Sequence, residues 1–225
     1  MKHFKNFKTC VYCTAQTLAS LDETTLARDY AYLEKYVGID KVYLETYRDG
    51  TWVAIDHMKM IQNFFKEHGV EIAGGITAVT PPLEKDDAKR QRLFQTFCYS
   101  NETMRTYLKK IVTYTAELFD EIILDDFFFT SCTCDDCLRE RSNLSWAEFR
   151  SNKMIDVAEN LVLKPAKLAN PSVKVTIKYP NWRESYHETG YVPKIQPSMF
   201  DKIYTGTETR NTAHTDQHLP RYLSY

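Results

Sequence analysis

The sequence has little of what builds linkers, membrane spans or nucleic-acid surfaces. Its 225 residues include only 7 Gly and 8 Pro, so no segment has the composition of a linker. The 29 Lys and Arg nearly cancel the 30 Asp and Glu, which excludes electrostatic capture of nucleic acid. No apolar run approaches the ~20 residues that cross a bilayer. The length and the 43% hydrophobic content instead suit one large α/β domain, or two small ones, with a sizeable core.

The start of the sequence does not resemble a signal peptide. Residues 1–8 are basic, and the TCVYCTA run of Thr9–Ala15 is too short and too polar for a signal-peptide core. We expect a cytoplasmic protein, or a periplasmic or secreted one if a signal peptide has been removed. Nothing in the sequence indicates an oligomeric state.

Six short apolar runs alternate with segments of helical periodicity. The runs predict strands at Thr9–Ala15, Lys41–Thr46, Val70–Ile76, Ile122–Leu124, Val173–Lys178 and Lys202–Gly206. Capping-box patterns, which begin helices, start at Ser20 and Ser145, and Asn101 is a further predicted cap. Residues 77–101 break the alternation, and we interpret them as an insertion in which Leu93–Tyr99 forms an extra strand.

Alternating strands and helices predict a parallel sheet with helical crossovers. Two α/β architectures fit: a (β/α) barrel of the TIM type and an open doubly wound sheet. No glycine-rich phosphate loop follows the first strand, and acids end the second, fourth and sixth strands, which favours the barrel. Because about six of the eight barrel units are present, we expect residues 1–225 to be a single barrel domain truncated at its C-terminus.

The acids near strand ends are Glu45, Asp125, Asp126 and Glu208. Cleavage of a glycosidic bond needs one carboxylic acid to protonate the leaving oxygen and one carboxylate to attack the sugar or to activate water. Because side chains alternate along a strand, we expect only one of the two aspartates to face the site, and we favour Asp126. In the plainer interpretation the aspartates cap a turn or pair with a lysine, and Glu45 forms an ion pair with Arg48.

A lysine and an aromatic loop end the fifth strand. Lys178 follows an apolar run, where a charge is costly to bury unless it is paired, so it is a candidate to hold a substrate hydroxyl or a catalytic carboxylate. The loop offers four rings on which a sugar could stack: Tyr179, Trp182, Tyr186 and Tyr191. The alternative is a solvated lysine beside ordinary aromatic packing.

Three of the six cysteines lie within six residues. Cys132, Cys134 and Cys137, with Cys98 from the insertion, would form a four-thiolate zinc site of structural type. A disulfide or free thiols are the alternatives. His214 and His218 are a weaker metal-binding candidate, because no H-E-x-x-H motif is present.

Five stretches resemble TIM-barrel glycoside hydrolases of carbohydrate-degrading bacteria. They are LDDFFFTSCTCDDC, LSWAEFR, KVYLETYRDG, VTIKYPNW and KIYTGTETR. The resemblance implies a retaining or inverting glycosidase that acts on a carbohydrate without a catalytic cofactor, using Asp126 as nucleophile or base and Glu208 as general acid. It places Glu45 and Lys178 in the sugar-binding shell. We add their neighbours as further candidates for that shell: Asp125, Tyr179, Trp182, Tyr204 and Arg210.

One departure from the resemblance affects these roles. Barrels of the β-galactosidase type carry a comparable C-x-C-x-x-C loop, but they place an Asn-Glu acid after strand four and a nucleophile after strand seven. Strand four here ends in Asp125-Asp126, which fits the α-galactosidase-type arrangement better.

Two other functions stay open. The first is a metal-dependent sugar isomerase or aldolase barrel, in which a divalent metal would be bound by Glu45, Asp126, Glu208 and His214. A barrel that only binds carbohydrate would keep the fold without the chemistry.

Overall fold

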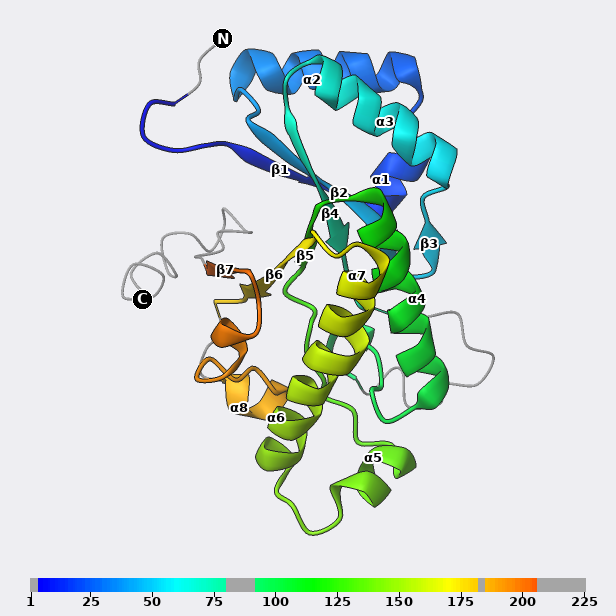
Figure 1. Ribbon diagram of the computed structural model, residues 1–225, viewed down its shortest axis with the longest axis vertical. Coiled ribbons are helices and arrows are strands. Elements are labelled where there is room, and N and C mark those ends of the chain that lie inside the picture. Colours follow the sequence, from blue (N-terminus) through cyan, green and yellow to red (C-terminus); the bar gives the residue numbers. More distant parts are fainter. Residues whose placement is uncertain (1–3, 80–91, 182–184, 206–225) are drawn as a thin grey trace.

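The computed structural model describes residues 4–79, 92–181 and 185–205 (Figure 1). Within them one sheet has the spatial order β1-β2-β4-β5-β6-β7, and β3 pairs with β2. The β3 strand is antiparallel to β2, whereas the six strands on the main path are parallel. The strands are β1 (Cys10–Cys13), β2 (Lys41–Arg48), β3 (Thr51–Trp52), β4 (Glu71–Ile76), β5 (Glu121–Leu124), β6 (Lys174–Tyr179) and β7 (Lys202–Thr205). The six predicted parallel strands are therefore confirmed, in chain order.

Helices connect these strands. In the described residues they are α1 (Ala15–Ser20), α2 (Glu23–Tyr36), α3 (Ile55–Glu67), α4 (Glu102–Leu118), α5 (Asp135–Arg141), α6 (Trp146–Val157), the π-helix η3 (Ala158–Leu163), α7 (Lys164–Ala169), α8 (Tyr186–Thr189) and the 3-10 helices η2 (Leu93–Gln95) and η5 (Gln196–Ser198). No described helix is both long and apolar enough to cross a membrane.

Two of the three predicted helix starts are confirmed. Asn101 caps α4, and Ser145 forms a capping box with Glu148 at the start of α6. The predicted box at Ser20 is wrong, because Ser20 ends α1 and its hydroxyl donates to the carbonyl of Thr17. The box that begins α2 is formed by Asp22 and Thr25.

The extra strand predicted at Leu93–Tyr99 is also wrong. This stretch begins with η2 and touches β structure only through an isolated antiparallel bridge between Val79 and Thr96. Phe94 and Gln95 have φ values of 52° and 55°, which are incompatible with an extended strand.

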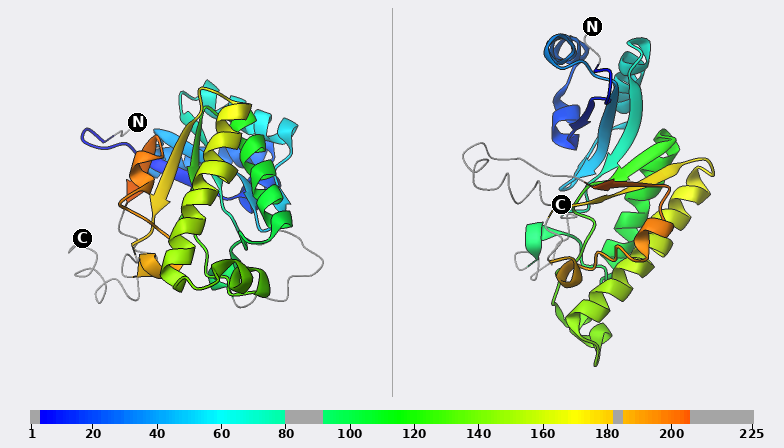
Figure 2. Two further views of the ribbon diagram at one scale, coloured as in Figure 1. Left: turned by 60° about the horizontal axis from the view of Figure 1, so that its bottom comes forward. Right: turned by 90° about the vertical axis from the view of Figure 1, so that its left-hand side faces the viewer.

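The sheet curls into a half-barrel with helices on its outer side. In the right-hand view of Figure 2 the first strands run up the page and the last ones run across it. The main core lies between the outer face and the helices, and includes Leu44, Ile122 and Ile177. A separate small cluster on the other face consists of Tyr43, Ala73 and Ile123, with Tyr12 packed against it.

Two adjacent glycines let both faces of β4 pack closely. A Cβ atom on Gly74 would lie 2.7 Å from side-chain atoms of Phe119 and of Thr115. A Cβ atom on Gly75 would lie 2.6 Å from the hydroxyl oxygen of Tyr12, on the inner face. Gly75 therefore makes room for Tyr12 inside the half-barrel.

A charged cluster lies at the N-terminal end of the half-barrel. The Glu121 carboxylate accepts hydrogen bonds from Lys41 Nζ at 2.6 Å, from Lys202 Nζ at 2.5 Å and from Tyr43 Oη at 3.2 Å. Burial by itself would raise the pKa of Glu121, but the hydrogen bonds and charges of Lys202 and Lys41 lower it below its ordinary value. Glu121 therefore joins three strands (β2, β5 and β7) through one carboxylate.

Candidate active site

Four of the predicted site residues, Glu45, Asp125, Asp126 and Lys178, lie at the C-terminal ends of β2, β5 and β6. Along each strand, alternate side chains face the inside of the half-barrel. This alternation brings Glu45, Asp125 and Lys178 to the same end of the inner face, where Arg48 joins them. The ends of parallel strands are where (β/α) barrels build their active sites.

The Glu45 carboxylate is fully buried and surrounded by donors. It accepts hydrogen bonds from Tyr12 Oη at 2.8 Å, from the Ala15 backbone N–H at 2.7 Å and from the Thr77 hydroxyl. Arg48 Nε lies 2.8 Å from Glu45 Oε2, so the ion pair considered as the plainer interpretation is confirmed. Protein donors thus occupy both oxygens, and Glu45 holds Arg48 rather than presenting an oxygen to a sugar or a metal.

A β-bulge explains how Glu45 and Arg48 come to share a face. In a regular strand, residues three apart point to opposite faces. The pairing of β2 with β4 shifts by one residue between Glu45 and Tyr47. Thr46 and Tyr47 then both face outwards: the Thr46 hydroxyl bonds Thr115 Oγ1 at 2.6 Å, and the Tyr47 ring packs on Trp52. The sequence shows no signal for this bulge.

Arg48 connects Glu45 to the aspartates after β5. Its Nη2 atom donates to Asp125 Oδ2 at 3.2 Å, and its guanidinium lies over the Phe127 ring, 5.6 Å from the centroid. Burial alone would lower the pKa of Arg48, but hydrogen bonding to Glu45 raises it. Arg48 is a permanent cation at the site, and nothing in the sequence indicates a role for it beyond pairing with Glu45.

Both aspartates reach Lys178, contrary to the expectation that they face opposite sides. Lys178 Nζ lies 3.2 Å from Asp125 Oδ1 and 3.4 Å from Asp126 Oδ2. The strand ends at Leu124, and the chain then turns, with the Phe128 N–H donating to the Asp125 carbonyl. Strand alternation therefore does not extend over Asp126, which is buried.

Two residues expected to bind sugar direct their side chains elsewhere. Tyr179 follows Lys178 on β6 and faces outwards, where it is buried against Tyr186 and Tyr191. Tyr204 faces inwards on β7 and pairs in register with Lys178, but its hydroxyl lies 2.6 Å from that of Tyr43, at the Glu121 cluster. The buried Tyr191 instead supports the site by donating to the backbone carbonyl of Asp126 at 2.9 Å.

Five of the residues considered at the sequence level lie outside the described residues. They are Trp182, Glu208, Arg210, His214 and His218. Their placement at the site stays a prediction from the sequence.

The four cysteines of the predicted cluster come together. Their sulfur atoms all lie within 4.8 Å of one another, and Cys98 Sγ is 3.6 Å from Cys134 Sγ and 3.6 Å from Cys137 Sγ. Four thiolates at ~2.3 Å from a zinc ion form a tetrahedron with edges of about 3.8 Å. The spacing therefore fits a four-thiolate zinc ion. The cluster ties the segment after β4 to the loop that follows the aspartates.

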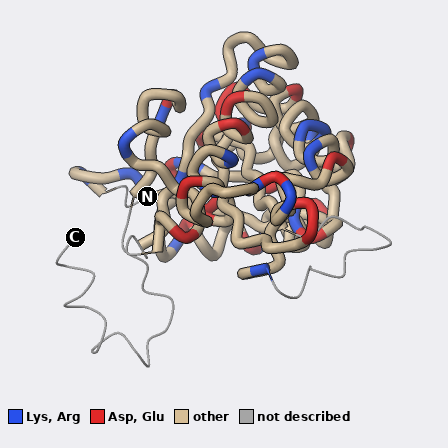
Figure 3. The backbone as a smooth tube through the Cα atoms, turned by 90° about the horizontal axis from the view of Figure 1, so that it is seen from below, with Lys and Arg blue, Asp and Glu red and all other residues tan. Residues whose placement is uncertain are grey.

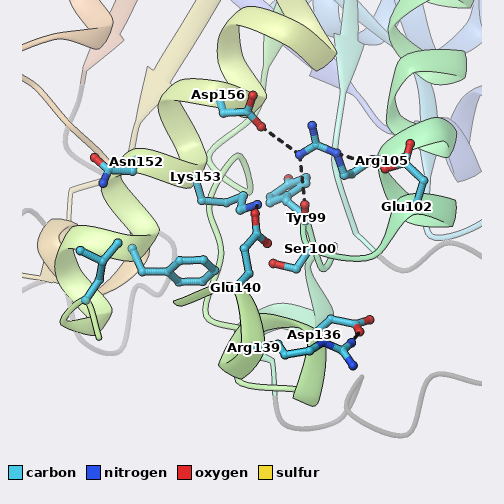
Figure 4. Close-up of a pocket in the computed structure, with 12 residues that line it drawn as sticks. Tyr99, Ser100, Glu102, Arg105, Asp136, Arg139, Glu140, Asn152, Lys153 and Asp156 are labelled. Atoms are coloured by element: carbon cyan, nitrogen blue, oxygen red, sulfur yellow. Dashed lines mark hydrogen bonds and ion pairs between the residues drawn. The ribbon is translucent and has the colours of Figure 1, made fainter. Parts of the chain in front are cut away.

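A charged groove of about 810 Å³ lies beside this cluster on the outer side of the half-barrel (Figure 4). Arg105 pairs with Asp156 at 2.9 Å, and Lys153 pairs with Glu140. These pairs link α4 to α6 and α5 to α6, so the groove charges neutralise one another. Figure 3 likewise shows acidic and basic positions interspersed over the described part of the chain.

Comparison with known proteins gives one family. All residues from 1 to 225 match the family model described as "Probable glycosyl hydrolase, catalytic domain". The chain is also 34% identical over 230 residues to an uncharacterized protein of Saccharolobus solfataricus, covering 92% of this chain and 38% of the relative.

The solved structures that resemble the chain include two β-galactosidases. The cold-adapted enzyme of Rahnella sp. R3 matches with a TM-score of 0.63 and 11% identity, over 90% of this chain and 40% of its own. The enzyme of the psychrophilic Marinomonas ef1 matches with a TM-score of 0.63 and 13% identity, over 90% of this chain and 41% of its own. The expected TIM-type architecture, with part of the barrel present, is confirmed. The chain spans about two fifths of the length of these proteins.

Proposed function

Because the chain belongs to the family described as probable glycosyl hydrolase catalytic domains, we propose that the ends of β2, β5 and β6 form part of an active site that cleaves a glycosidic bond. The observation that carries this proposal is the position of Lys178, which contacts the carboxylates of both Asp125 and Asp126 at the C-terminal ends of the strands. Paired carboxylates beside a cation at this end of the half-barrel suit the chemistry of glycoside hydrolysis.

The proposed roles of the residues around Lys178 are supported by their contacts, whereas that of Glu208 comes from the sequence. Asp126 attacks the anomeric carbon or activates water, and Glu208 protonates the leaving oxygen. Arg48 and Lys178 contact Asp125 from two sides, which assigns Asp125 to positioning rather than to proton transfer. The side chain of Lys178 is 28% exposed, so it also remains accessible to a substrate hydroxyl.

The test uses the intact protein that contains this chain and a panel of aryl glycosides. Asp126→Asn and Glu208→Gln are each expected to lower kcat/KM by about 10²–10⁴-fold on the substrate that is cleaved. Asp135→Asn, an exposed change in the first turn of α5, is the matched control and should leave kcat/KM unchanged. Full activity in Asp126→Asn would remove that residue from the mechanism. NMR of the first-formed anomer distinguishes a retaining from an inverting enzyme.

The geometry disfavours the metal-dependent isomerase or aldolase. Its ligand set includes Glu45, whose oxygens are already occupied by Tyr12, Ala15, Thr77 and Arg48. The positive charge of Arg48 at this position also repels a divalent cation. Hydrolysis is therefore expected not to depend on added divalent ions, and to persist after dialysis against a chelator for as long as the cysteine cluster keeps its zinc. A barrel that only binds carbohydrate predicts sugar binding without turnover, which the same panel detects.

We also propose that Cys98, Cys132, Cys134 and Cys137 hold a structural zinc ion. The sulfur spacing supports it, and four thiolate ligands leave no open position for a substrate. The ion would fix the loop that carries the aspartates, away from the reacting atoms. The alternatives are a disulfide or free thiols, and metal analysis together with thiol titration of the purified intact protein separates the three.

A further inference from the structure

Phe94 is an exposed aromatic residue held in a strained backbone conformation. Its side chain is 55% exposed, and its φ of 52° lies in the left-handed region, where Gln95 follows at 55°. Non-glycine residues adopt this region at an energetic cost, and such residues cluster at ligand-binding positions. A single exposed phenylalanine would need no explanation by itself, but Phe94 is also held in place by its neighbours.

The surrounding residues fix the Phe94 ring in one position. It packs at a right angle to Phe127, with a centroid distance of 5.3 Å and an interplanar angle of 84°, and the Phe129 centroid lies 6.3 Å away. Phe129 is fully buried, so this contact is part of the core. On the N-terminal side, the Leu93 N–H donates to Ser131 Oγ at 2.7 Å. The segment after β4 is thus attached to the loop after β5 on both sides of the aromatic contact.

The same rings connect Phe94 to the proposed catalytic groups. The guanidinium of Arg48 lies 5.6 Å from the Phe127 centroid, and Arg48 contacts Asp125 at 3.2 Å. A continuous series of contacts therefore runs from Phe94 through Phe127 and Arg48 to the carboxylates. Cys98, four residues after Phe94, is within 3.6 Å of the sulfur atoms of the Cys134–Cys137 loop, which anchors the other end of the segment.

We propose that Phe94, supported at a right angle by Phe127, forms an aromatic platform that stacks against a sugar ring of the substrate next to the carboxylates. The inference rests on the proposed function for its substrate class. The ring hydrogens of a pyranose make an apolar face, and burying that face on an exposed aromatic ring removes apolar surface of both from water. Arg48, which lies over the Phe127 ring, would hydrogen-bond the hydroxyl groups at the edge of the same sugar. Phe94 would then set affinity for the sugar without taking part in bond cleavage.

Three substitutions of Phe94 in the intact protein test this platform. Phe94→Tyr keeps the ring, Phe94→Ala removes it in the same strained backbone, and Phe94→Gly removes it and relieves the strain. Phe7→Ala, which removes another phenylalanine that is 59% exposed, is the matched control. The measurements are KM and kcat for the aryl glycoside that is cleaved, and Kd for the product sugar by calorimetry.

We expect Phe94→Ala and Phe94→Gly to raise KM and Kd about 10-fold, with kcat within about twofold, as loss of one aromatic contact predicts. Phe94→Tyr and Phe7→Ala should bind as the unaltered protein does. Unchanged KM and Kd in Phe94→Ala, with hydrolysis intact, would overturn the platform and leave the proposed function standing. Sugar binding that Phe94→Ala weakens, in a protein that hydrolyses no glycoside, would support the platform and reject the proposed function.

Discussion

The guanidinium of Arg48 and the carboxylate of Glu45 lie on the same face of β2, 2.8 Å apart, although the two residues are three positions apart in the strand. The bulge between Glu45 and Tyr47 creates this pair. Glu45 is buried, whereas the Arg48 side chain is 22% exposed and continues to Asp125. Through this pair, the packed interior of the half-barrel holds the proposed catalytic residues in position.

Glu45→Gln is expected to destabilise the protein by about 3 kcal/mol, because it leaves the Arg48 charge without its buried partner. Urea unfolding of the intact protein measures the loss. Glu71→Gln is the matched control, since Glu71 is 56% exposed in its pair with Lys8 and should contribute under about 1 kcal/mol. Equal losses in the two variants would show that Glu45 does not hold Arg48 in place.

Lys178→Met should lower kcat/KM at least about 100-fold, because it removes the cation that contacts both Asp125 and Asp126 and leaves the two carboxylates to repel each other. The measurement is steady-state hydrolysis of the glycoside identified with the panel. Lys174→Met, an exposed change at the other end of β6, should leave kcat/KM nearly unchanged. If both variants keep full activity, Lys178 has no part in the site.

Glu121→Gln should lower the free energy of unfolding near neutral pH and make that free energy depend less on pH in the acid range. The pKa of Glu121 is lowered below 4.5 in the folded protein. The ionised carboxylate therefore stabilises the fold fully above the pKa that Glu121 has in the unfolded chain, and this stabilisation is lost as the pH falls below about 4.5. We expect a loss of about 3 kcal/mol at pH 7 that shrinks towards pH 3. Unfolding midpoints from pH 7 to pH 3 measure it, with the exposed Glu67→Gln as control. A loss independent of pH would contradict the ionic role of Glu121.

Removal of zinc should loosen the loop that carries the aspartates. Cys132→Ser is expected to lower the zinc content from about one equivalent towards zero and to lower the unfolding temperature, because metal binding is coupled to folding. Cys10→Ser changes an exposed cysteine outside the cluster and should keep the metal. If the purified protein contains no zinc and mass spectrometry finds a disulfide, the cluster is a covalent link and not a metal site.

The sequence alone predicted those parts of the fold that depend on neighbouring residues. Apolar runs and helical periodicity located the six strands, and Ser145 with Glu148 located the start of α6, because a cap and its partner lie within one turn. The local spacing of Cys132, Cys134 and Cys137 predicted a cluster. Acids at strand ends predicted where the site lies, since parallel strands place their C-terminal ends at one edge.

Only the tertiary structure decided which of these side chains meet. Alternation fails where the β2 bulge turns Arg48 towards Glu45, and where the chain turns after Leu124 so that Asp126 reaches Lys178. Phe94 and Phe127 lie 33 positions apart in the sequence and touch only because the segment after β4 folds over the loop after β5. Local patterns fix periodicity and caps, whereas bulges, turns and loop contacts are set by the packing of residues that are distant in the chain.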